Sequence, residues 1–167
     1  MPDLFETMYS MRSMRRLKPD TVAPELIHKI IEAGTQAPNG QNTQPWAFVV
    51  VQEADDKVFI AEHYRRVMRE RLRGSPPDAS DTSQKARTGR AAWHLSQHMH
   101  EAPVLLLVCG KRDWPFLVPA EERVGLAPPS YGSVYPCVQN ILLTCRALGL
   151  GATLTTLHQL FQPELHE

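Results

Sequence analysis

A short cationic segment near the N-terminus is the first candidate for chemistry. Residues 11–18 contain four basic side chains and no acidic one. Guanidinium forks and a hydroxyl are groups that hold a phosphate in proteins, and Arg12, Ser13, Arg15 and Arg16 supply them here. The same residues also fit a solvated basic face near the C-terminus of a helix, where the helix dipole favours cations. The spacing alone leaves both interpretations open.

A loop rich in side-chain amides is the second candidate. Residues 37–45 contain two prolines and four amides, namely Asn39, Gln41, Asn42 and Gln44. Amides offer donors and acceptors together, as a planar heterocycle with carbonyls and ring nitrogens requires. The alternative is a turn-rich loop whose amides bond their own backbone.

Metal and nucleophilic chemistry have little support in the sequence. His94 and His98 have the i, i+4 spacing that can hold a metal on a helix, but no third ligand recurs nearby. We therefore expect no metal, and we expect these histidines and His100 to be surface groups. The three cysteines form no CxxC pair, which is typical of reduced thiols in a cytoplasmic protein. The P-loop, GxGxxG and GxSxG motifs do not occur in the sequence.

Length and charge limit the class of protein. The 167 residues correspond to one domain on a scale of about 100–200 residues per domain. Eighteen basic residues balance eighteen acidic ones, which argues against a protein that mainly coats nucleic acid or an anionic membrane. The longest apolar run, residues 103–109, is far shorter than the roughly 20 residues that span a bilayer. The N-terminus lacks the pattern of a secretory signal, so we expect a cytoplasmic location.

Hydrophobic periodicity predicts the elements that position these residues. Asp3, with Glu6 three residues later, predicts the start of a short helix. Pro24 predicts the first turn of a second helix, which Gly34 and Pro38 end. Further helices are predicted over residues 57–73, 84–101 and 133–148, a helical turn over 163–167, strands buried on both faces over 46–51 and 103–109, a third strand over 152–156, and loops over 74–83 and 110–130.

Three stretches together resemble the FMN-dependent nitroreductase superfamily. Residues 12–17 are similar to its N-terminal Arg-Arg-Ser-x-Arg motif. Residues 37–51 are similar to its Ala-Pro-Ser-x-x-Asn-x-Gln-Pro-Trp loop and the strand that follows. Residues 139–156 are similar to its late helix and flavin-facing strand. The order and spacing of the stretches agree over nearly the whole chain.

The resemblance implies an α+β fold with a mostly antiparallel central sheet flanked by helices. It further implies one nitroreductase-like domain over residues 1–167, in an intertwined homodimer with FMN sites at the subunit interface. FMN would be the bound cofactor, NAD(P)H the reducing co-substrate and a small molecule the substrate. Neither nucleic acid nor a membrane is expected as a partner.

The resemblance also implies which residues contact FMN. The phosphate and ribityl end would lie against the cationic segment, the isoalloxazine against the amide loop of the partner subunit and the strand after the late helix. Since flavin N5 carries the chemistry, no catalytic protein residue is expected, and Thr155 is the best candidate for a donor near the flavin. The implied cofactor-binding residues are Arg12, Ser13, Met14, Arg15, Asn39, Gly40, Asn42, Leu154, Thr155 and Thr156.

Two positions depart from the family pattern. Met11 stands where the motif has its first arginine, which removes one expected phosphate partner. Family chains usually continue beyond the position of Glu167 to another strand and a basic residue. The domain is therefore expected to lack that C-terminal strand, either by truncation of the sequence or by absence of the element.

The resemblance implies a ping-pong oxidoreductase that passes hydride from NAD(P)H to a nitroaromatic or a quinone. One alternative is a protein that stores FMN without turnover, which the Met11 departure and the short C-terminus favour. Another is reductive dehalogenation, as in the related deiodinase branch. That branch grips an amino-acid zwitterion with Glu, Tyr and Lys of a lid, and residues 62–101 offer no convincing set of this kind.

Replacement of Arg15 by alanine tests the phosphate assignment. Loss of a charge-assisted hydrogen bond to a phosphate costs about 1.5–3 kcal/mol, so Arg15→Ala should weaken FMN binding roughly tenfold to a hundredfold. Flavin fluorescence quenching measures the affinity, and circular dichroism checks the fold. Unchanged affinity in a natively folded variant would show that Arg15 does not bind the phosphate.

Overall fold

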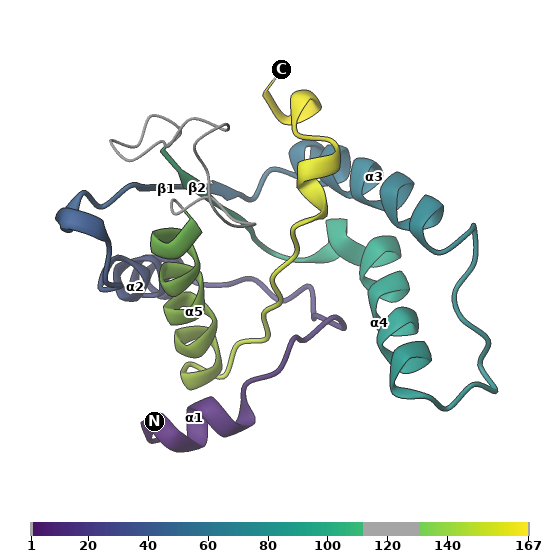
Figure 1. Cartoon of the computed structure of the whole chain (residues 1–167), viewed down its shortest axis with the longest axis horizontal. Helices are drawn as coiled ribbons and strands as arrows, with labels where there is room; N and C mark the ends of the chain where they lie inside the picture. The colour runs from purple at the N-terminus through teal and green to yellow at the C-terminus, as the bar shows by residue number, and fades with distance from the viewer. Residues whose placement is uncertain (1, 112–130, 167) are drawn as a thin grey trace, which may run out of the picture. The chain divides into compact units, whose positions relative to one another are not determined.

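In one part of the computed structural model, α2 (Pro24–Thr35) and α1 (Leu4–Ser10) pack against α5 (Tyr131–Ala147), and the strands β1 (Trp46–Val51) and β2 (Leu105–Gly110) pair with each other (Figure 1). The structure describes residues 2–111 and 131–166. Nearly all of the loop predicted over residues 110–130 lies outside the described residues, as does Glu167.

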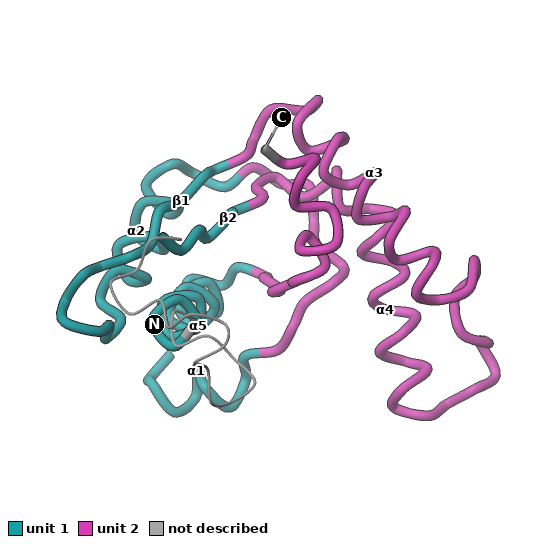
Figure 2. Tube along the Cα trace, turned by 45° about the horizontal axis from the view of Figure 1, so that its top comes forward, with its two compact units in different colours: residues 1–11, 22–50, 106–150 teal, residues 12–21, 51–105, 151–167 magenta. Residues whose placement is uncertain are grey.

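The chain divides into two compact units, which Figure 2 distinguishes by colour. The first unit comprises residues 1–11, 22–50 and 106–150, and the second comprises residues 12–21, 51–105 and 151–167. No helix in the described ranges is long and apolar enough to cross a membrane.

The first unit depends on close packing of α2 against α5. A Cβ atom at Gly34 would lie only 2.9 Å from Ile141 Cγ1 and 3.1 Å from Cys137 Sγ, so the helices can approach this closely only because Gly34 has no side chain. Asn140 Nδ2 also donates a hydrogen bond to the carbonyl oxygen of Ala33, at 3.2 Å. The missing side chain at Gly34 and the Asn140–Ala33 hydrogen bond therefore set the distance between α2 and α5.

The predicted starts of α1 and α2 are confirmed, whereas α2 continues past Gly34 to Thr35 and α5 begins two residues before the predicted position 133. Asp3 caps α1, because its side chain accepts a hydrogen bond from the backbone N–H of Glu6 at 2.8 Å. Pro24 occupies the first turn of α2. Gly149 ends α5 with a φ of +76°, and Leu150 N then donates to Cys145 O at 2.8 Å, which closes the helix end.

β1 has the predicted bounds and β2 begins two residues later than predicted, but β1 is less buried than expected. The prediction that both faces are covered is wrong for β1, since Val49 and Val50 are 48% and 36% exposed. β1 and β2 run antiparallel as a two-stranded sheet, with no third strand among the described residues (Figure 1). The sheet is therefore smaller than the central sheet that we expected, and two strands are too few to bury their apolar residues on both sides.

The predicted third strand is also wrong. Residues 152–156 have no regular secondary structure. The β-branched composition favours an extended backbone, but a strand forms only where a neighbouring strand pairs with it. Within the described ranges this segment instead contacts the irregular segment around Met14, through a hydrogen bond from Met14 N to Ala152 O.

The second unit contains a pair of helices, α3 (Ala54–Arg71) and α4 (Gln84–His98), and the C-terminal segment packs against α3. α3 lies beside α4, and short 3₁₀ helices follow at η2 (Met99–Glu101), η4 (Leu157–Leu160) and η5 (Pro163–His166). Arg66 Nη2 forms an ion pair with Glu164 Oε1 at 2.8 Å, which joins η5 to α3. The buried core cluster comprises Ala61, Tyr64, Val67, Met68, Leu95, Met99 and Phe161.

Phe161 should contribute strongly to the stability of the second unit, since it is 1% exposed in this cluster. Phe161→Ala should lower the free energy of unfolding by about 3–5 kcal/mol, because it removes buried apolar surface and leaves a cavity. Leu160→Ala is the matched control, since Leu160 is 65% exposed. Urea unfolding followed by circular dichroism compares the variants, and equal effects would contradict the packing described.

Candidate functional site

The cationic segment lies against the residues that follow α5, within the second unit. Met14 N donates to Ala152 O at 2.9 Å. A Cβ at Gly151 would lie 3.0 Å from Leu17 Cδ2 and 3.4 Å from Met14 Cβ, so the segments approach closely because Gly151 has no side chain. The structure therefore brings the predicted phosphate residues beside the segment that contains Leu154.

The side chains of this segment suit an anion. Arg15 is half-buried, and it forms no ion pair with any residue in the described part of the chain. Ser13 is exposed one position after Arg12. A guanidinium without a carboxylate partner among the described residues can donate its N–H groups to an anionic ligand. This supports the phosphate interpretation over a fully solvated face.

The threonines beyond Ala152 supply hydroxyl groups. Leu157 N donates to Thr155 Oγ1 at 3.4 Å, so the hydroxyl proton of Thr155 is not used in that contact. The hydroxyl oxygen of Thr153 is buried and has no hydrogen-bond partner among the described residues. A buried polar atom without a partner is uncommon in native proteins, and a bound ligand is one group that can satisfy it. Sequence reasoning did not single out Thr153.

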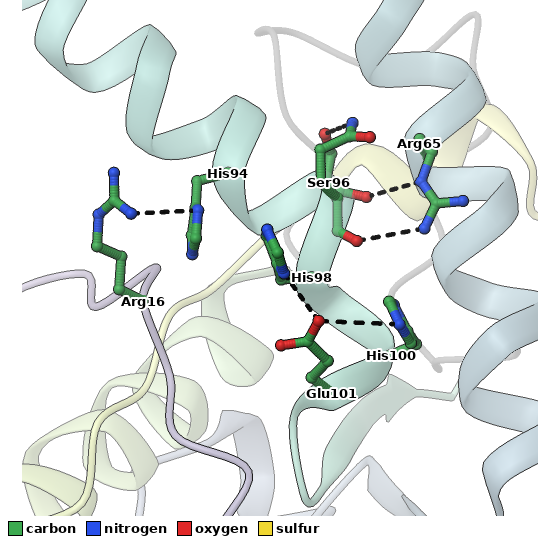
Figure 3. A network of polar contacts seen from close by, with 8 residues as sticks. Arg16, Arg65, His94, Ser96, His98, His100 and Glu101 are labelled. Carbon is green, nitrogen blue, oxygen red and sulfur yellow. Dashed lines mark hydrogen bonds and ion pairs between the residues drawn. The ribbon is translucent and has the colours of Figure 1, made fainter.

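A histidine network contacts the cationic segment from α4 (Figure 3). Arg16 Nη1 lies 3.2 Å from His94 Nδ1. Since a guanidinium can only donate, Nδ1 must accept, and the neutral ring then carries its proton on Nε2. The His94 and His98 rings stack with centroids 4.3 Å apart, and His98 Nδ1 lies 2.8 Å from Glu101 Oε1.

The charges around His94 favour its neutral form. Burial lowers its pKa below the usual 6.5, Arg16 and His98 lower it further, and Glu101 opposes them. His98 in turn lowers the pKa of the Glu101 carboxyl through their hydrogen bond. His94 is therefore neutral near pH 7, as an acceptor from Arg16 must be. In the described ranges, no group of three or more histidine, cysteine or acidic residues could hold a metal ion.

The amide loop lies in the first unit and is closed by Asn39. The Oδ1 atom of Asn39 accepts from Gln44 N at 2.8 Å, and its Nδ2 donates to Ala37 O at 3.3 Å. Gly40 N donates to the buried Ser133 Oγ of α5, at 3.3 Å. Asn39 thus bonds its own loop, as the turn interpretation predicted. Ser133 is a supporting residue that sequence reasoning did not find.

Three residues of this loop have an unusual backbone conformation. Gln41, Asn42 and Gln44 have φ values of 52°, 54° and 46°, in the left-handed region that side chains other than glycine seldom adopt. Such conformations persist where surrounding contacts hold them, and they concentrate at binding sites. The exposed side chain of Asn42 is available for a ligand, although Gln44 Nε2 donates to its Oδ1 at 3.4 Å.

A family model described as the nitroreductase family matches residues 9–167. The chain's helices and small antiparallel sheet agree with that match. The chain belongs to the nitroreductase family.

Particular relatives include iodotyrosine deiodinase 1 of Sus scrofa, which is 32% identical over 111 residues. That match covers 64% of this chain and 36% of the deiodinase, so the chain spans little more than a third of that relative's length.

Solved structures show the same fold. A crystal structure of oxidised iodotyrosine deiodinase bound to FMN and 3-iodo-L-tyrosine aligns with a TM-score of 0.71 and 23% identity, over 96% of this chain and 81% of that one. A putative nitroreductase of a Desulfovibrio desulfuricans subspecies, in complex with FMN, aligns with a TM-score of 0.55 and 25% identity, over 92% of this chain and 67% of that one.

Replacement of Asn39 should loosen the amide loop. Asn39→Ala removes the acceptor for Gln44 N, so amide exchange at Gln44 should accelerate about tenfold, the effect of roughly 1.4 kcal/mol. Asn39→Asp is the matched control, because it keeps an acceptor oxygen. Hydrogen exchange followed by NMR compares the three proteins. Equal acceleration in both variants would show that the Oδ1 contact does not hold the loop.

Proposed function

We propose that this chain is an FMN-dependent oxidoreductase that takes hydride from NAD(P)H and passes electrons to an electron-poor small molecule such as a nitroaromatic or a quinone. The observation that carries the proposal is the cationic segment beside residues 151–156 in a chain of the nitroreductase family, where the half-buried Arg15 has no ion pair with any described residue.

The phosphate end of FMN fits the donor set of the second unit. Arg12 and Arg15 would supply guanidinium groups, Ser13 a hydroxyl and Met14 backbone to a phosphate monoester. The buried Thr153 hydroxyl has no hydrogen-bond partner among the described residues and directly follows Ala152, which bonds to Met14, and this supports a polar ligand there. The putative nitroreductase from Desulfovibrio was crystallised in complex with FMN, which supports the same cofactor here.

The isoalloxazine end would be contacted by residues of two subunits. Leu154, Thr155 and Thr156 would lie against the flavin, and the contact of Thr155 with Leu157 N does not use the hydroxyl proton of Thr155. Asn39, Gly40 and Asn42 would come from the partner subunit of a homodimer. Bound FMN would supply the two-electron chemistry, while this chain binds and orients the cofactor and places donors around it.

Reductive dehalogenation is a second candidate, because similarity to iodotyrosine deiodinases favours it. The second unit offers little for gripping an amino-acid zwitterion with Glu, Tyr and Lys. Tyr64, the sole tyrosine between residues 54 and 101, is 4% exposed in the core cluster. Lys57 Nζ donates to Ala102 O at 3.0 Å. An iodotyrosine would therefore need other partners than these.

One set of assays separates the candidate functions. The purified protein is loaded with FMN, and native mass spectrometry should find two chains with two FMN molecules. The first assay supplies NADH or NADPH with a quinone, and the second supplies dithionite with 3-iodo-L-tyrosine.

The proposal expects nicotinamide oxidation that depends on the quinone, and no release of iodide. Iodide release without nicotinamide oxidation would instead establish the dehalogenase. FMN binding without turnover in either assay would indicate a storage protein. Stoichiometric FAD in place of FMN would contradict the cofactor assignment.

A further inference from the structure

We propose that His94 is a positioning residue for the anion-binding residues Arg12, Ser13 and Arg15, and that it acts by holding the guanidinium of Arg16 (Figure 3). The inference rests on the proposed function, since the anion concerned is the phosphate of FMN. It assigns to α4 a role in cofactor affinity that the family motif does not contain.

The segment needs external contacts because it has no regular structure of its own. Residues 12–15 belong to no helix or strand, so their conformation depends on contacts with neighbouring segments. Two contacts come from one side, namely the hydrogen bond from Met14 N to Ala152 O and the packing of Leu17 against Gly151. The Arg16–His94 hydrogen bond is a contact from α4, and it is made by the residue next to Arg15.

α4 is itself held where His94 meets Arg16. Arg65 of α3 donates from Nε to Ser96 O and from Nη2 to Gln97 O, both at 3.3 Å. His98 stacks on His94 and bonds to Glu101, as Figure 3 shows. A side chain that is fixed by its neighbours loses less entropy when it forms a hydrogen bond, so His94 is suited to restrain Arg16.

The contact depends on the protonation state of His94. Neutral His94 can accept at Nδ1, whereas protonated His94 has no acceptor and places a second cation beside Arg16. The charged and titratable groups around it are Arg16, His98 and Glu101, and His100 Nε2 approaches Glu101 to 4.0 Å. The contact is therefore present above the pKa of His94 and is lost as the pH falls through that pKa.

The test measures FMN affinity against pH for the wild type, His94→Ala and His94→Asn. Asparagine places an acceptor oxygen near the position of Nδ1 and does not titrate. At pH 7.5, His94→Ala should raise the Kd about threefold to tenfold, whereas His94→Asn should stay within about twofold of the wild type. Between pH 7.5 and pH 5, wild-type affinity should fall relative to His94→Asn.

The ratio of wild-type to variant affinity at each pH removes the effect of protonating free FMN, because free FMN is the same in every measurement. His28→Asn is the matched control, since His28 is exposed on α2 in the first unit. It should match the wild type throughout. A constant ratio of wild-type to His94→Asn affinity across this pH range would overturn the proposal. So would tighter wild-type binding at low pH, since it would make protonated His94 a phosphate ligand.

A second measurement does not require FMN. Imidazole NMR gives the pKa of His94 in the wild type and in Arg16→Ala. Because Arg16 lowers the pKa of His94, its removal should raise that pKa. An unchanged pKa would overturn the contact and the inference with it. If the wild type binds no FMN, the proposed function fails, while this titration still reports whether Arg16 and His94 are in contact.

Discussion

The hydrogen bond from Met14 N to Ala152 O is the constraint on which the rest of the candidate site depends. It joins two segments without regular secondary structure, so neither could hold its conformation alone. Gly151 permits this approach because a side chain there would meet Leu17 and Met14. If the two segments separated, the guanidinium groups near Met14 and the hydroxyls beyond Ala152 would no longer belong to one site.

The fold of the second unit holds the C-terminal segment at both ends. At one end Ala152 bonds to Met14, and at the other Phe161 is buried between residues of α3, α4 and η2. The Arg66–Glu164 ion pair lies on the surface, where such pairs contribute at most about 1 kcal/mol. Burial of Phe161 is therefore the larger contribution, and it keeps the intervening threonines in place.

Local sequence signals predicted the elements well, whereas contacts between distant residues were not visible in the sequence. The Asp3 cap, Pro24 in the first turn of α2 and the extent of β1 follow from neighbouring residues. The prediction of a third strand over residues 152–156 was wrong because β-branched residues do not indicate whether a neighbouring strand is available to pair. The predicted burial of Val49 was wrong for a similar reason, since burial depends on the number of layers that cover a strand.

The candidate site shows the same division. Its motifs indicated the cationic segment and the amide loop, because phosphate and heterocycle recognition require particular residue types. The supporting residue Ser133 carries no such pattern, and the i, i+4 spacing of His94 with His98 indicated only a metal pair or surface groups. Each is set by a contact across its own unit of the fold, to Gly40 and Arg16 respectively, and a single serine or histidine on a predicted helix does not by itself indicate such a contact.

Hydrogen exchange with and without FMN tests the central claim most directly, namely that the cationic segment and the segment after α5 hold the cofactor together. Mass spectrometry should find slower exchange on FMN binding in peptides covering residues 11–18 and 151–157. Stoichiometric FMN binding that leaves the exchange of both segments unchanged would contradict the account.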